Sequence, residues 1–151
     1  MIKKLLALIT PKESEPNKAS EESIKLAAIS LLVQVAKADH TLSEQEESKL
    51  VELVNSHFNE SKQLEHDELI ALAMAKSDAS TSLYEFTSLI NESYDMTQKF
   101  QLITLMWTIA FSDNVIDTYE EHLIRRVADL IYLPHMKFIE AKHIAKEENS
   151  A

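Results

Sequence analysis

The sequence predicts an all-α protein, a compact bundle of about seven helices. Three observations lead to this prediction: the 151 residues include no glycine, only three are proline, and apolar residues recur at helical spacing along most of the chain. Sheet proteins rely on glycine for tight hairpin turns and bulges, so its absence favours helices joined by Asn, Asp, Ser or His turns. A chain of this length can bury a core without disulfides.

The composition excludes several classes of function. The chain has no cysteine, which excludes disulfides, thiolate metal sites and a cysteine nucleophile, and which fits a reducing, cytoplasmic compartment. Its 15 basic and 25 acidic residues give a formal net charge of −10, which disfavours binding to nucleic acid or to an anionic lipid surface. The same charge would attract a cation or a basic partner, although charge of this size often serves solubility alone.

The first ten residues form a short amphipathic segment, with Ile2, Leu5, Leu6 and Ile9 on one helical face. Its apolar run is too short for a signal peptide and far short of the ~20 residues that span a bilayer. We expect it to pack back on the domain, and contact of residues 1–10 with a membrane surface or a partner is the alternative. The predicted organisation is a segment and flexible linker at 1–19, a helical domain at 20–146 and a frayed polar tail at 147–151.

The helical domain begins at Ser20, which is placed to cap a first helix over Glu22–Ala38. This helix is apolar on almost every side, a pattern typical of a buried central helix. The chain then turns at Asp39–Thr41. A capping box, Ser43-x-x-Glu46, begins an amphipathic helix, since each of its side chains can satisfy a free backbone donor at the helix start.

The same pattern returns 74 residues later. A capping box at Asp95-x-x-Gln98 begins a second nearly all-apolar helix, Thr97–Ser112, and Asp117-x-x-Glu120 begins the next amphipathic one. Chance does not supply this many matches in register, so we interpret them as an internal duplication of a helix–acidic loop–helix unit. The matched pairs are Ala36/Ala110, Asp39/Asp113, Leu42/Ile116, Ser43/Asp117, Glu46/Glu120, Glu47/Glu121, Leu50/Ile124 and Leu53/Val127.

Three further helices complete the bundle. Apolar stripes from Leu64 to Met74 and from Leu83 to Ile90 lie between the two copies. Pro134 fits the first turn of a last helix that runs through Ile144, because a proline there removes no intrahelical hydrogen bond.

The two motifs resemble the TerB family of tellurite resistance proteins and the related domain of some membrane-anchored co-chaperones. They are AKADHTLSEQE at Ala36–Glu46 and AFSDNVIDTYE at Ala110–Glu120, and the resemblance covers about residues 20–146. It implies a compact helical bundle with a role in tellurite resistance or stress response, in which two acidic loops chelate a cation. The chain departs from the family at His40, where members often carry glycine. It shows no J-domain or transmembrane segment, so the co-chaperone form is not expected.

The resemblance also places a candidate metal site. The family's loop aspartates fall on Asp39 and Asp113, and its helix-start glutamates on Glu46 and Glu120. Three neighbouring carboxylates are further candidates: Asp117, Glu47 and Glu121.

Two interpretations of these carboxylates stay open. If the two units pack as a pseudo-twofold pair, the carboxylates repel one another unless a cation neutralises them, and oxygen ligands suit Ca²⁺, Mg²⁺ or Mn²⁺ better than zinc. Neither loop is an EF-hand, because the twelfth position from the aspartate is Leu50 or Ile124 rather than glutamate. Capping and solvated charge explain the same residues without a metal, except for the duplicated aspartate, which capping does not require.

Nothing in the sequence indicates catalysis. It has no glycine-rich phosphate loop, nucleophile elbow or His-Glu-x-x-His motif, and Trp107 falls in an apolar stripe typical of a core. We therefore expect a monomeric, non-catalytic module that binds or senses a divalent cation and has an unidentified protein partner. The alternative is a metal-independent protein–protein interaction domain of the co-chaperone or stress-adaptor type.

Overall fold

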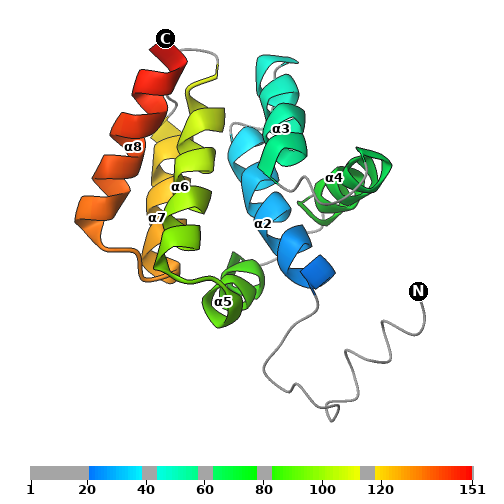
Figure 1. Ribbon diagram of the computed structural model, residues 1–151, viewed down its shortest axis with the longest axis horizontal. Helices are drawn as coiled ribbons and strands as arrows, with labels where there is room; N and C mark the ends of the chain where they lie inside the picture. Colours follow the sequence, from blue (N-terminus) through cyan, green and yellow to red (C-terminus); the bar gives the residue numbers. More distant parts are fainter. Residues whose placement is uncertain (1–20, 39–43, 58–62, 78–82, 113–117, 151) are drawn as a thin grey trace.

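The described part of the chain is built from α-helices. The computed structural model describes residues 21–38, 44–57, 63–77, 83–112 and 118–150, and within these ranges it contains seven helices and no strand (Figure 1). This confirms the all-α prediction. The helices are α2 (Glu21–Ala36), α3 (Glu44–His57), α4 (Gln63–Ser77), α5 (Leu83–Ser93), α6 (Met96–Ala110), α7 (Thr118–Leu130) and α8 (His135–Ser150).

Two adjacent and roughly parallel helices, α2 and α6, form the centre of the bundle (Figure 1). The two most extensive helix contacts are those of α4 with α2 and of α8 with α6. α3 packs beside α2 and α7 beside α6, while α5 crosses the lower end of the bundle and contacts α2 and α7. α3 also contacts α6, and α2 also contacts α7, so the two three-helix groups share one core.

The central helices are apolar on nearly every side because neighbours cover them on nearly every side. Their predicted ranges, Glu22–Ala38 and Thr97–Ser112, differ from the observed ones by one or two residues. Both contribute long runs of fully buried side chains to the core. The core residues of α2 and α6 are Ala27, Ala28, Ile29, Leu31, Leu32, Val33, Val35, Ala36, Leu102, Ile103, Leu105, Met106, Trp107, Ile109 and Ala110.

The helix boundaries repeat at the predicted interval. Ala36 and Ala110 end α2 and α6, Glu44 and Thr118 begin α3 and α7, and both pairs are 74 residues apart. Together with the matching contacts of α2–α3–α4 and α6–α7–α8, this register supports the duplication, which stays an inference from the sequence.

The capping box predicted for α6 is confirmed. The backbone N–H of Gln98 donates to Asp95 Oδ1 at 2.8 Å, and the backbone N–H of Asp95 donates to Gln98 Oε1 at 2.9 Å. Each side chain thus satisfies a backbone donor that the helix itself leaves free. The predicted caps Ser20, Ser43 and Asp117 lie outside the described residues.

α7 ends in a Schellman motif without glycine. The Leu133 N–H donates to the Ala128 carbonyl at 2.9 Å, and the Tyr132 N–H donates to the Asp129 carbonyl at 3.1 Å. Tyr132 takes the left-handed position of this motif with φ of 63°, where glycine is usual. Pro134 then precedes α8, in the place predicted for it.

The last helix is longer than predicted. α8 continues to Ser150, four residues beyond the predicted domain boundary at 146. Lys146, Glu147 and Glu148 are good helix formers, and no proline or glycine interrupts them.

Candidate cation site

The two predicted acidic loops begin and end at one end of the bundle. α2 and α6 run side by side in the same direction, so their C-terminal residues, Ala36 and Ala110, lie at the upper end in Figure 1. Asp39, Asp113 and Asp117 fall in the connections that follow, and they lie outside the described residues. The candidate ligands that the structure does describe are Glu46, Glu47, Glu120 and Glu121.

Two of these four glutamates are buried and two are not. Glu46 and Glu120, each the third residue of its helix, are only 1% and 2% exposed. Glu47 is exposed, and Glu121 is half-buried. The buried pair occupies equivalent positions of α3 and α7, so the two units bury the same carboxylate.

The helical period explains why these two side chains are inside. Glu46 lies four residues before Leu50 on the apolar face of α3, and Glu120 lies four residues before Ile124 on that of α7. The resemblance singled out Glu46 and Glu120 and left Glu47 and Glu121 as further candidates, but their burial was not predicted. The spacing to the first core residue of each helix was the available signal.

The third residue of α6 gives a direct comparison. Gln98 completes the capping box of that helix and is exposed. A capping box therefore does not need its third residue to be buried. The burial of Glu46 and Glu120 is a feature beyond capping.

The surface glutamates have local surroundings that suit a solvated role. Glu121 Oε2 lies 3.4 Å from Nη2 of Arg125, one turn further along the exposed side of α7. Such i,i+4 ion pairs are typical of a solvated helix surface.

The helix ends bring both positive and negative partial charge to this end of the bundle. α3 and α7 begin here, and the positive ends of their dipoles favour the carboxylates of their first turns. α2 and α6 end here, and neither carries a basic residue in its last turn to offset the partial negative charge of its final carbonyls. A cation placed between the buried carboxylates and these carbonyls would be attracted by both.

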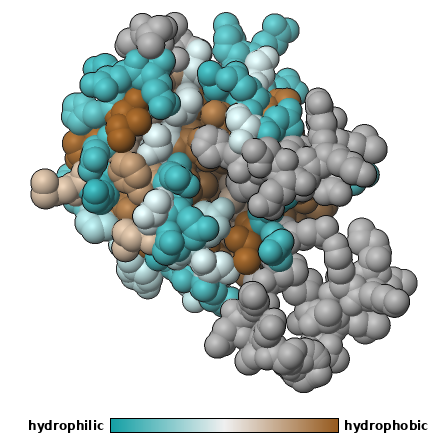
Figure 2. All heavy atoms as spheres, in the orientation of Figure 1, coloured by the Kyte–Doolittle hydropathy of each residue, from teal (hydrophilic) through white to brown (hydrophobic). Residues whose placement is uncertain are grey.

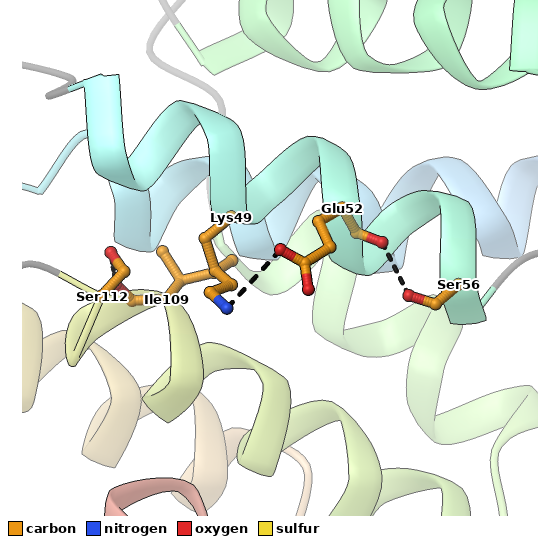
Figure 3. A network of polar contacts seen from close by, with 5 residues as sticks. All are labelled: Lys49, Glu52, Ser56, Ile109 and Ser112. Atoms are coloured by element: carbon orange, nitrogen blue, oxygen red, sulfur yellow. Dashed lines mark hydrogen bonds and ion pairs between the residues drawn. The ribbon is translucent and has the colours of Figure 1, made fainter. Parts of the chain in front are cut away.

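A lysine that the sequence analysis overlooked lies near the end of α6. Figure 3 shows Lys49 of α3 reaching toward the last turn of α6, where Ser112 Oγ donates to the Ile109 carbonyl at 2.7 Å. Lys49 Nζ lies 3.6 Å from Glu52 Oε1, and Ser56 Oγ donates to the Glu52 carbonyl at 2.7 Å. The ammonium group of Lys49 thus brings positive charge to the contact between α3 and α6.

Among the residues that the structure describes, no three or more His, Asp or Glu side chains form a group that could hold a metal ion. Asp39, Asp113 and Asp117 lie outside the residues to which this finding applies. In the described helices, no segment is both long and apolar enough to cross a membrane.

Comparison with known proteins places the chain in a family. The family model of the tellurite resistance protein TerB matches residues 25–143. No curated protein matches the chain. A crystal structure of a protein of unknown function from Porphyromonas gingivalis W83 is similar, with a TM-score of 0.61 and 22% sequence identity. The match covers 85% of this chain and 97% of that protein's chain. That likeness concerns the fold alone.

Proposed function

This chain belongs to the TerB family of tellurite resistance proteins, and on that premise we propose that it is a non-catalytic module that binds a divalent cation. The cation is Ca²⁺, Mg²⁺ or Mn²⁺, and it binds at the end of the bundle where α2 and α6 end and α3 and α7 begin. Its ligands come from Asp39, Asp113, Glu46 and Glu120.

The observation that carries the proposal is the burial of Glu46 and Glu120. Charged carboxylates are rarely buried, because removing them from water is costly unless hydrogen bonds, a counter-charge or a metal ion compensates. Two such side chains stand at equivalent positions of two helices, while Gln98 at the same capping position of α6 is exposed. Capping alone selects the residue type but not its burial.

The chemistry of the candidate ligands sets the class of ion. Every candidate is a carboxylate, and the chain contains no cysteine. Hard oxygen donors bind Ca²⁺, Mg²⁺ and Mn²⁺ well, whereas structural zinc sites use cysteine and histidine. A non-catalytic role agrees with the absence from the sequence of the common catalytic motifs.

Thermal unfolding with and without each divalent cation tests the proposal. A cation that binds only the folded state at a hundredfold excess over its dissociation constant stabilises it by about 2.7 kcal/mol. In a chain of this size that is a rise in Tm of about 5–10 °C. Asp39→Asn, Asp113→Asn and Glu46→Gln should each remove most of this rise, because both units supply one site.

Two controls separate ligand loss from general effects. Glu47→Gln removes the same charge one position along α3, from an exposed side chain, and should keep the full response. Asp95→Ala removes a cap at the other end of the bundle and should lower Tm equally with and without the cation. A wild-type protein whose Tm is indifferent to every divalent cation would refute the proposal and leave the metal-independent interaction domain as the better one.

A further inference from the structure

One side of α8 faces the core, and the outward side carries charged side chains together with exposed Met136 and half-buried Ile139 and Ile144, of which Ile139 also packs against the core. Phe138, Ala141 and Ala145 face the core and are buried. The outward side carries a shallow groove of about 630 Å³ that includes Met136, Ile139 and Ile144 in its lining. Met136 is 81% exposed. Figure 2 shows apolar atoms breaking the hydrophilic surface on the side of the molecule where Figure 1 places α8.

Beyond Lys137, the charged side chains that line the groove are acidic. Glu140 and Glu147 line it and are exposed. Lys137 stands near its N-terminal end, where it pairs with Glu140 at 3.3 Å. An occupant of the groove therefore needs an apolar face and a basic end.

The N-terminal segment of the same chain has both features. Ile2, Leu5, Leu6 and Ile9 share one helical face, and Lys3 and Lys4 stand at the far end from the linker. As a helix, residues 2–9 would be about 12 Å long, which is shorter than the 16 residues of α8 at about 24 Å.

The linker joins the bundle at the end where α8 begins. α2 begins at the lower end in Figure 1, the same end at which α8 begins. Residues 10–19 can span up to about 33–36 Å when extended, more than the length of α8. The linker joins the segment to the same chain as the groove, so docking is an intramolecular event.

The tether also fixes a direction. A segment that enters from the N-terminal end of α8 must lie antiparallel to it, with Ile9 toward Met136 and Lys4 toward Glu147. Its basic end then meets the acidic half of the groove and avoids Lys137. The two helix dipoles oppose each other, which is the favourable arrangement.

We propose that residues 1–10 dock antiparallel to α8 in the groove formed by Met136, Ile139 and Ile144, with Lys3 and Lys4 against Glu140 and Glu147. The occupant of the groove is then a segment of the same chain.

Disulfide trapping in the full chain tests this docking cleanly, because the protein has no cysteine of its own. The test pair is Leu5→Cys with His143→Cys, which joins the segment to the middle of the groove. The control pair is Leu5→Cys with Ser48→Cys, since Ser48 lies in a second, strongly acidic groove on α3 with Glu44, Glu47 and Glu52. The rate of disulfide formation in the control pair shows how much electrostatic attraction alone contributes.

We expect the intramolecular disulfide of the test pair to form about tenfold faster than that of the control pair, as its local concentration requires. Charge reversal by Lys3→Glu and Lys4→Glu should make the two rates equal. Adding Glu140→Lys and Glu147→Lys should restore the faster rate of the test pair. Equal rates in both pairs would overturn the proposal. Disulfide-linked dimers would overturn it in favour of a second copy, and sedimentation of the wild-type chain with anionic phospholipid vesicles would overturn it in favour of a lipid surface.

Discussion

Trp107 offers the sharpest test of how the core is built. Its side chain is fully buried in α6, and its ring centroid lies 5.8 Å from that of Phe111 and 5.4 Å from that of Phe138 on α8. Lys142 Nζ lies 5.2 Å from the ring centroid and covers it from α8. Trp107 therefore joins α6 to α8 at the most extensive helix contact of the bundle.

The indole ring also carries an unusual donor. Trp107 Nε1–H is buried and has no hydrogen-bond acceptor among the residues that the structure describes. A buried donor without an acceptor destabilises the folded state by about 1–3 kcal/mol. The tryptophan thus contributes a large apolar surface and a polar atom that offsets part of that gain.

Two substitutions at this position should differ widely. Trp107→Ala removes the ring and should lower the free energy of unfolding by about 3–5 kcal/mol. Trp107→Phe keeps a ring and deletes the unpaired donor, so its net effect should stay within about 1.5 kcal/mol. The two variants therefore differ in the packing that they lose and in whether a ring remains.

Urea unfolding followed by far-UV circular dichroism measures both variants, because Trp107 is the only tryptophan and its fluorescence is lost with it. Glu68→Ala, at an exposed position of α4, is the control and should change stability by no more than about 0.5 kcal/mol. If Trp107→Phe is as destabilising as Trp107→Ala, the indole N–H has an acceptor and the reasoning is wrong.

Three further predictions concern caps and titration. Asp95→Ala should lower the free energy of unfolding by about 0.5–2 kcal/mol, measured by urea unfolding, because the capping bond to the Gln98 N–H is lost. Tyr132→Gly should raise the Tm, since a non-glycine residue at positive φ costs roughly 1–2 kcal/mol, whereas Tyr132→Val should lower it. Burial raises the pKa of Tyr94 above 10.0, so the unfolded chain ionises first and stability should fall as pH rises above 10.0 toward the folded-state pKa. Tyr94→Phe should remove that part of the alkaline loss in melting curves.

The helices could be predicted because local pattern and tertiary packing agree along most of the chain. The near-continuous apolar character of α2 and α6 has one explanation, burial on all sides, and the structure places both at the centre. The capping box of α6 is a local interaction within four residues, so its sequence signature was sufficient. These features need no knowledge of distant contacts.

Other features depend on information that the pattern does not carry. The left-handed end of α7 was not predicted, because Tyr132 has none of the local preference of glycine or asparagine for positive φ. The end of α8 at Ser150 was missed because polar residues that form helices well resemble a frayed tail. The burial of Glu46, by contrast, could have been predicted from its four-residue spacing to Leu50, on the apolar side of α3.

The comparison of the two units also bears on the choice between a cation and capping. Val33 and Trp107 are 74 residues apart and both fully buried, yet their side chains differ greatly in size. At the third position of α3 and α7, however, both units carry a buried glutamate. Glutamine can complete the same capping box, as Gln98 does in α6, without a charge in the interior. Capping does not require a buried charge at either position, whereas the proposed cation would compensate both carboxylates. Glu46→Gln separates these two alternatives, because glutamine can complete a capping box, as Gln98 does in α6, and carries no charge.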